Sequence, residues 1–210
     1  MLKVGLTGGI AAGKSSVGEM FVALGAHLVQ ADAIAHQLMQ PGESVYQEVV
    51  QHFGSGILDP DGRINRARLA QAAFGEPSHI RELNQIVHPP VIRRHDEWME
   101  EMGRRDSRAI AIVEAALILE AGLVNHFDQL IVVTCKPEQR VERWAGRVHV
   151  DMETARKEVL RRMAAQLPDE EKIKVADHVI DNSGSLDDTA QQVKSVYQEL
   201  KRLVDFERSV

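Results

Sequence analysis

The feature that most constrains this chain is a glycine-rich stretch close to its first residue. Residues 3–20 read KVGLTGGIAAGKSSVGEM, and Gly8, four further residues and then Gly13-Lys14-Ser15 fit the pattern G-x-x-x-x-G-K-[S/T]. Glycine permits backbone angles and a close approach that a Cβ would block, so the amides of such a turn can surround phosphate oxygens. The apolar residues before the turn and the helical pattern after it favour phosphate binding over a turn with an incidental lysine.

The motif assigns a role to each part of this turn. We expect nine consecutive residues to bind a nucleotide: Gly8, Gly9, Ile10, Ala11, Ala12, Gly13, Lys14, Ser15 and Ser16. Lys14 would reach the β and γ phosphates, the Ser15 hydroxyl would ligate Mg²⁺, and Ser16 could contact the α-phosphate. The helix that follows adds the partial positive charge of its N-terminus.

Composition narrows the class of protein further. The chain has 210 residues, of which 44% are hydrophobic, so it can bury a sizeable core as a single domain. A net charge of −6 argues against nucleic acid or an anionic membrane as the main partner, and we predict no obligatory protein partner. No apolar stretch approaches the ~18 residues of a membrane span, and we expect no signal peptide. The single cysteine, Cys135, leaves no intrachain disulfide, which favours the cytoplasm.

Five short apolar runs predict strands, and helical patterns lie between them. The predicted strands are Leu2–Thr7, His27–Gln30, Ala109–Glu114, Leu130–Cys135 and His178–Ile180. Runs that barely alternate are typical of strands covered on both faces, and intervening helices indicate parallel pairing with right-handed crossovers. We therefore predict an α/β, P-loop NTPase-type three-layer sandwich with a five-stranded parallel sheet, an inserted helical substrate lobe and a lid.

Helices are expected at both ends of the chain and in two insertions. Lys14–Leu24 is amphipathic and stops at Gly25, and Leu186–Leu203 has apolar residues at helical spacing. The segment of about 40–104 is mostly helical and is punctuated by three turn signals, Pro41-Gly42, Asp59-Pro60-Asp61-Gly62 and His88-Pro89-Pro90. We predict a core of residues 1–39, 105–142 and 176–204, a lobe at about 40–104, a lid at about 143–175 and a frayed tail from 205.

Asp32 is the main candidate for acid–base chemistry. It follows the second predicted strand, which we place beside the first, and ligands bind at the carboxyl edge of such a sheet. A carboxylate there could accept a proton from an attacking hydroxyl and help to hold water on magnesium. The alternative is a helix N-cap for Ala33–Met39, and one residue could fill both roles.

Three arginines, Arg140, Arg143 and Arg147, are spaced to share one helix face. Such a face could close over ATP and neutralise charge on the phosphoryl group in transfer. The alternative is a solvated face paired with Glu138 and Glu142.

A series of short motifs runs along most of the chain, from GLTGGIAAGKSSV through Ala31-Asp32, Pro41-Gly42, Phe53-Gly54, DGRINRARL, Phe74, LNQIVHP, LILE, Gln166 and Ala176-Asp177 to VIDNSG at Val179–Gly184. In these motifs the chain resembles the dephospho-coenzyme A kinases, which phosphorylate a ribose 3′-hydroxyl in the last step of coenzyme A synthesis. The phosphate loop is shared with many families, whereas the Leu-Asn…His-Pro and Ala-Asp…Asn-Ser-Gly elements in this order are more particular.

The resemblance implies a kinase with a nucleotide-binding core, a coenzyme-A-binding lobe and a lid. It implies that Asp32 is the base for the 3′-hydroxyl, that Arg143 and Arg147 are lid arginines and that Asn182 lies near adenine. ATP with Mg²⁺ and dephospho-coenzyme A are the implied substrates. The sequence departs from the family pattern at Gln30, where an acid is usual, and at Ala116, where a proline is common.

We therefore predict transfer of the ATP γ-phosphoryl to dephospho-coenzyme A, with Asp32, Lys14, Arg143 and Arg147 as catalytic residues. One alternative is a related kinase that acts on a nucleotide or another small alcohol. The other is a nucleotide-dependent switch or binding module with little chemistry. Against it stand the lack of an N-K-x-D guanine-binding motif and the presence of both an acid and a lid face.

Overall fold

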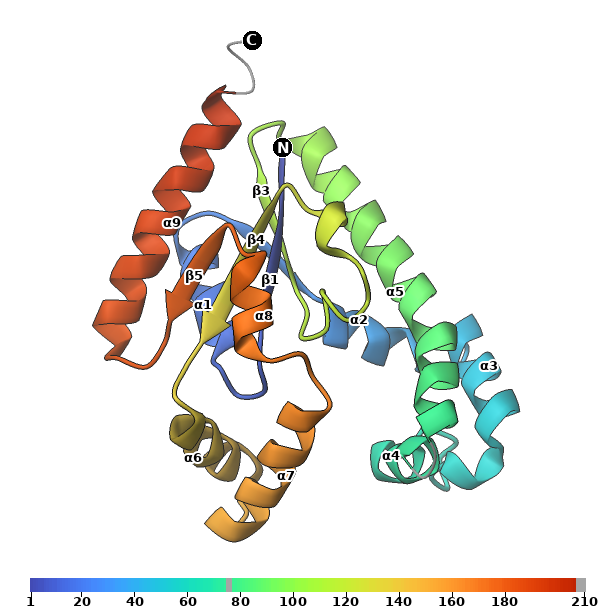
Figure 1. Ribbon diagram of the computed structural model, residues 1–210. Coiled ribbons are helices and arrows are strands. Elements are labelled where there is room, and N and C mark those ends of the chain that lie inside the picture. Colours follow the sequence, from blue (N-terminus) through green and yellow to red (C-terminus); the bar gives the residue numbers. More distant parts are fainter. Residues whose placement is uncertain (75–76, 207–210) are drawn as a thin grey trace. The chain divides into compact units, whose positions relative to one another are not determined.

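The computed structural model describes residues 1–74 and 77–206, which divide into two compact units (Figure 1). One unit comprises residues 1–29 and the chain from 101 onward, and the other comprises residues 30–100. The strands are β1 (Leu2–Gly8), β2 (His27–Gln30), β3 (Ile110–Glu114), β4 (Gln129–Thr134) and β5 (His178–Asp181). The larger unit also holds the helices α1 (Lys14–Ala23), η2 (Val124–His126), α6 (Pro137–Val148), α7 (Met152–Ala164), α8 (Asp169–Lys174) and α9 (Leu186–Phe206).

The five strands form one parallel sheet in the order β2-β3-β1-β4-β5, which confirms the predicted fold class. β1 pairs with β3 on one side, where Leu6 lies opposite Glu114, and with β4 on the other, where Leu6 lies opposite Ile131. The prediction that β2 adjoins β1 is wrong, because β3 lies between them. A strand pairs on two sides only, and β1 uses both sides for the more apolar β3 and β4.

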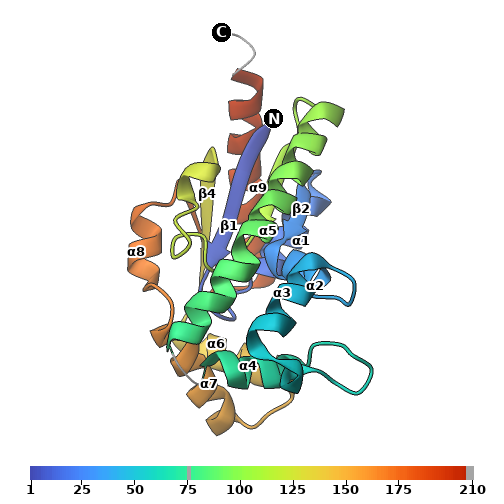
Figure 2. The same cartoon turned by 90° about the vertical axis from the view of Figure 1, so that its right-hand side faces the viewer.

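Helices and loops cover the two faces of the sheet. On one face, α1 and α9 bury apolar side chains such as Val17, Phe21 and Leu200 against the strands. On the other face, the segment after β3 packs Ile118 and its neighbours against Leu130 and Val132 of β4. Figure 2 shows α8 on one side of β1 and β4, and α1 and α9 on the other. Burial on both faces accounts for the continuous apolar runs of β1, β3 and β4.

The predicted terminal helices are confirmed with small shifts. α1 ends in a Schellman motif, in which the Ala26 amide donates to Phe21 O at 3.0 Å and the Gly25 amide donates to Val22 O at 2.9 Å. Gly25 has φ 106°, so its position favours glycine. α9 continues to Phe206, three residues beyond the predicted end, and residues 207–210 of the predicted frayed tail lie outside the described residues.

α6 and α7 form a helical hairpin that is visible in both views (Figures 1 and 2). Its core is made by Trp144, Ala145, Ala155 and Val159. Asp151 caps α7, because its carboxylate accepts the Thr154 amide at 2.9 Å. The hairpin overlaps the predicted lid of about 143–175 but begins six residues earlier, at Pro137, and residues 165–168 connect it to α8.

The smaller unit is helical. It holds α2 (Ala31–Leu38), α3 (Ser44–Phe53), η1 (Ser55–Ile57), α4 (Arg66–Phe74) and most of α5 (Pro77–Arg105). Asn65 begins α4, since its side-chain oxygen accepts the amides of Ala67 and Arg68 at 3.0 and 3.1 Å. Its side-chain nitrogen donates to Asp59 at 2.8 Å, which closes residues 59–65 into a turn just before the helix.

The expectation that His88-Pro89-Pro90 punctuates the chain is wrong. Both prolines lie inside α5, which continues to Arg105. Each proline removes one backbone donor from the helix, so the helix must be held by other contacts. Val87 and Val91 on either side are buried, and this apolar packing offsets the lost hydrogen bonds.

Within residues 1–74 and 77–206, none of the helices is both long enough and apolar enough to cross a membrane.

Candidate active site at the phosphate-binding loop

The loop between β1 and α1 has the backbone that the glycine pattern predicts. Gly13 has φ 97°, in the left-handed region, and Ala11 at the tip has φ 52°. A Cβ on Gly8 would collide with the carbonyl oxygen of Val133 on β4, so the loop leaves the sheet in close contact with the neighbouring strand. The Val17 amide donates to Gly13 O at 3.1 Å and begins the helical ladder of α1. The turn therefore leads directly into a helix N-terminus, as anion binding requires.

Lys14 and Ser15 point toward the loop and the adjoining strand. Lys14 Nζ donates to the carbonyl oxygens of Gly8 and Gly9, both at 3.0 Å. Ser15 Oγ donates to Glu114 Oε1 at 2.8 Å. Glu114 is the last residue of β3 and is only 8% exposed. A buried carboxylate beside the hydroxyl of a phosphate loop supplies oxygen ligands of the type that Mg²⁺ prefers.

Sequence reasoning missed Glu114. The available signal was an acid at the end of an otherwise apolar run, AIAIVE, at the carboxyl edge of a predicted inner strand. The register of β1 on β3 places Glu114 opposite Leu6, two residues before the loop begins. This pairing brings Glu114 to Ser15.

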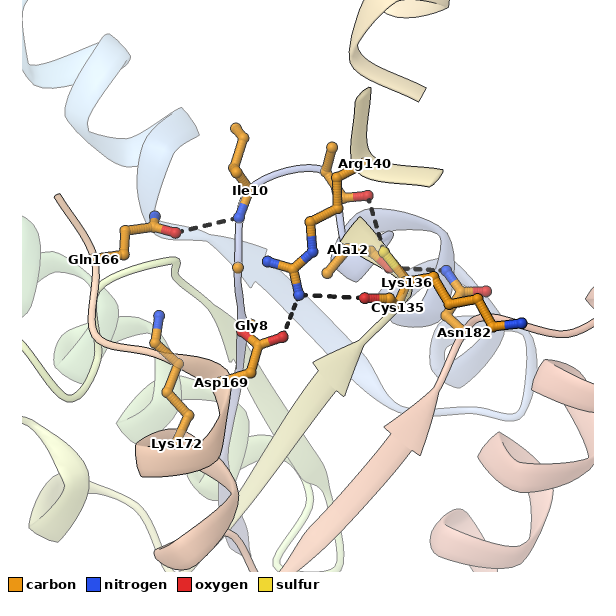
Figure 3. Close-up of polar contacts among 12 residues, drawn as sticks. Gly8, Ile10, Ala12, Cys135, Lys136, Arg140, Gln166, Asp169, Lys172 and Asn182 are labelled. Carbon is orange, nitrogen blue, oxygen red and sulfur yellow. Dashed lines mark hydrogen bonds and ion pairs between the residues drawn. The ribbon is translucent and has the colours of Figure 1, made fainter. Parts of the chain in front are cut away.

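Asn182, which follows β5, and Arg143 of α6 both contact the loop at Ala12 O. Figure 3 shows Asn182 beside Ala12. Asn182 is buried, and its side-chain nitrogen donates to Ala12 O at 2.9 Å, while its oxygen accepts the Thr189 hydroxyl at 3.0 Å. Arg143 donates to Ala12 O at 3.2 Å and to Asn182 O at 2.8 Å. Two predicted site residues from distant parts of the chain thus meet at one loop carbonyl.

Arg140 differs from the other two arginines of α6. It is 3% exposed, pairs with Asp169 at the start of α8 and packs against Gly9, where a Cβ would collide with its guanidinium. A shared, solvent-facing arginine face is therefore wrong for Arg140. The reason is that the start of α6, where Arg140 lies, packs against the loop. Arg143, one turn further along α6, is partly exposed, and Arg147 is exposed.

Cys135 lies between the loop and Arg140. Burial raises the pKa of its thiol above the usual value, and the nearby arginines oppose this shift only in part. Its Sγ lies 3.8 Å from Ala11 O. These features describe a small buried residue that packs under the loop.

Arg147 is exposed and lies over the ring of Trp144, 4.6 Å from its centroid. Arg162 of α7 lies over the same ring at the same distance. Trp144 belongs to the core of the α6–α7 hairpin, against which Ile10 and Ala11 of the phosphate-binding loop also pack. The hairpin and the loop therefore share one apolar cluster.

Asp32 belongs to the smaller unit and is exposed. The expected N-cap role is wrong, because α2 has its N-cap at Gln30 and Asp32 is the second residue of the helix. An acid in this first turn still interacts favourably with the helix dipole. In the part of the chain that the structure describes, no group of three or more His, Cys, Asp or Glu residues is arranged to hold a metal.

The sequence of this chain is similar, over nearly its whole length, to those of known proteins. Residues 2–188 match the family model described as dephospho-CoA kinase. The dephospho-CoA kinase of Aquifex aeolicus is 41% identical over 207 residues, which cover 96% of this chain and 99% of that protein. The chain belongs to the dephospho-CoA kinase family. This assignment confirms the predicted activity, the final step of coenzyme A synthesis.

Solved structures agree with the assignment. A protein from Thermus thermophilus has a TM-score of 0.77 at 33% identity and covers 94% of this chain and 96% of its own. The dephospho-CoA kinase from Campylobacter jejuni has a TM-score of 0.67 at 25% identity, over 95% and 96% of the two chains. Both solved structures therefore match this dephospho-CoA kinase family member over nearly the whole chain.

Proposed function

We propose that this chain transfers the γ-phosphoryl of ATP to the ribose 3′-hydroxyl of dephospho-coenzyme A and releases ADP and coenzyme A. Family membership supports the reaction. The observation that carries the proposal is the contact between Ser15 and Glu114 at the foot of a glycine-rich loop, since it joins a phosphate site to a carboxylate. In such kinases positioning and electrostatic stabilisation supply most of the rate.

The residues present fit a magnesium ion bound with ATP. Ser15 Oγ and the Glu114 carboxylate would hold it, directly or through water, because both offer oxygen ligands. When bound there, Mg²⁺ would supply positive charge that offsets the negative charge developing on the phosphates.

Other residues of this chain would orient the nucleotide. Lys14 would exchange its bonds to Gly8 O and Gly9 O for phosphate oxygens, since its amine already lies at the loop that would surround them. Arg143 and Asn182 would keep the loop in shape through Ala12 O and place the β5 end near adenine. Arg147, exposed on the hairpin, would add positive charge when the lid encloses the phosphates.

Asp32 is proposed as the base that accepts the proton of the 3′-hydroxyl. It follows β2 by two residues, so connectivity brings it to the carboxyl edge of the sheet, where ligands of open α/β folds bind. The helical lobe would bind the coenzyme-A portion of the substrate. The enzyme would act on small soluble substrates, without nucleic acid, membrane or partner protein. The reaction would take place in the cytoplasm, where a single free thiol is stable.

The deciding assay measures ADP release from ATP and Mg²⁺ with and without dephospho-coenzyme A. We expect release to depend on dephospho-coenzyme A. Stimulation only by a nucleoside monophosphate would replace the proposed acceptor with a nucleotide. No stimulation by any acceptor would instead favour a nucleotide-dependent switch.

A further inference from the structure

Gln166 makes a contact with the phosphate-binding loop that the proposed reaction does not use. Its side-chain oxygen accepts the amide of Ile10 at 3.2 Å, across 156 residues of sequence (Figure 3). We propose that Gln166 is a positioning residue, which couples the lid helices to the loop through this amide and whose neutrality allows phosphates to bind beside it. The inference rests on the proposed nucleotide site and deepens it.

Ile10 is held in two ways at once. Its side chain packs against the apolar core of the α6–α7 hairpin, next to Trp144 and Val159. Its amide is bound by Gln166, which stands two residues after α7. The hairpin therefore holds Ile10 through its side chain, and the segment that follows the hairpin holds it through its backbone.

Gln166 begins a short segment, residues 166–172, that is anchored at two further points. Asp169 pairs with Arg140, which itself packs against Gly9 of the loop. Lys172, fully buried, pairs with Glu120 at 3.1 Å and donates to Ala116 O at 3.4 Å. The two ionic anchors attach the segment to α6 and to the chain after β3.

The Leu167 amide adds a bond to Glu120 at 2.9 Å. With this bond the segment is held at both ends, so Gln166 cannot move far without disturbing Asp169 or Lys172. Its position relative to the loop is consequently set by tertiary contacts outside the loop itself.

The chemistry of the side chain explains why an amide suits this position. The loop amides are the donors that would surround a polyanion. A glutamine oxygen accepts one of them without bringing a negative charge, whereas a carboxylate at the same place would repel the phosphates. A glutamate at this position would thus keep the hydrogen bond to Ile10, but its negative charge would weaken ATP binding.

The test compares Gln166→Glu, Gln166→Met and a matched control, Gln129→Glu. Gln129 begins β4 at the opposite edge of the sheet, and its side chain bonds the neighbouring Asp128 O at 2.8 Å. MgATP affinity is measured by calorimetry in low and high salt, together with kcat, KM for ATP and the thermal midpoint without ligand. The wild-type protein is assayed first for ATP binding and for ADP release that depends on dephospho-coenzyme A.

We expect Gln166→Glu to weaken ATP binding about tenfold or more, with the loss shrinking at high salt, because the added charge lies beside the phosphates. Gln166→Met, which loses the acceptor without adding charge, should raise KM a few fold, and Gln129→Glu should bind ATP like wild type. A merely structural glutamine predicts the reverse order, with Met worse than Glu, and that order would overturn the proposal.

The proposal is also overturned if Gln166→Glu binds ATP like Gln129→Glu, or if the wild-type protein binds no ATP. Wild-type protein that binds ATP without any response to dephospho-coenzyme A would instead reject the proposed acceptor, while the three variants still decide the role of Gln166.

Discussion

The side-chain nitrogen of Asn182 packs against the α-carbon of Gly13, where a Cβ would collide with it. The same nitrogen donates to Ala12 O at 2.9 Å, so one buried amide holds the carbonyl just before Gly13. Gly13 also has φ 97°, a conformation that side chains rarely adopt. The position therefore requires glycine twice, once for its backbone angle and once for its lack of a side chain.

We expect Gly13→Ala to lower the free energy of unfolding by about 2–4 kcal/mol, since left-handed strain costs ~1–2 kcal/mol and the clash with Asn182 adds to it. ATP affinity should fall at least tenfold because the loop must move. Urea unfolding and ATP titration would measure the two effects.

Gly42→Ala is the matched control for this substitution. Gly42 has φ 100°, but no atom lies within 4 Å of the place where its Cβ would stand. It should therefore show the backbone strain alone. An equal loss of stability in both variants would contradict the collision with Asn182.

Glu114→Gln tests the proposed magnesium ligand. The substitution keeps an oxygen that can accept the Ser15 hydroxyl, at 2.8 Å in the wild type, but removes the charge. We expect the Mg²⁺ concentration for half-maximal activity to rise about tenfold, since a charged oxygen attracts the ion more strongly than an amide oxygen. An unchanged magnesium dependence would remove Glu114 from the metal site.

Asp32→Asn tests the proposed base. Asparagine has a similar shape and cannot accept the proton, so turnover should fall about a hundredfold or more while ATP affinity is retained. Single-turnover phosphorylation of dephospho-coenzyme A and ATP titration separate the two quantities. If the variant turns over as fast as the wild type, Asp32 is not the base, and its role is limited to stabilising the start of α2.

Lys172→Met tests the buried ion pair with Glu120. Lys172 is fully buried, whereas the Glu120 side chain is 19% exposed and also accepts the Leu167 amide. We expect a loss of about 2–4 kcal/mol in unfolding free energy, because one carboxylate is left in a desolvated place. The double variant with Glu120→Gln should recover part of this loss, and purely additive effects in denaturation would argue against the pair.

Glu158, in the α6–α7 hairpin, should make the free energy of unfolding depend on pH. Hydrogen bonds from Arg161 and then Arg162 lower the pKa of its carboxyl from 4.5 to about 2. A lowered pKa in the folded state stabilises the fold above pH 4.5, and this contribution is lost as the pH falls toward 2.

Carboxyl NMR titration should find Glu158 ionised at pH 3, and Glu158→Gln should flatten the dependence of unfolding free energy on pH within that window. A Glu158 that titrates near its ordinary pKa would show that its bonds with the two arginines do not persist in solution.

Local sequence patterns were enough for the strands and the two terminal helices of this fold. β1, β2, β3, β4 and β5 lie within a residue of their predicted bounds. For β1, β3 and β4 the reason is burial on both faces, which makes each of them a continuous apolar run. Gly25 marks the end of α1 because its backbone angle favours glycine at that point. The prolines of α5 misled the prediction, since the packing of Val87 and Val91 outweighs a local preference.

The phosphate-binding loop and the family were determined by the sequence itself, because backbone angles, Gly13, Lys14 and Ser15 are all encoded within one short stretch. What only the tertiary structure decided is the support around that loop. Glu114 reaches Ser15 through strand register, and Gln166 reaches Ile10 across 156 residues. Such contacts depend on which strands pair and which helix faces pack, and no local pattern in a single chain records those choices.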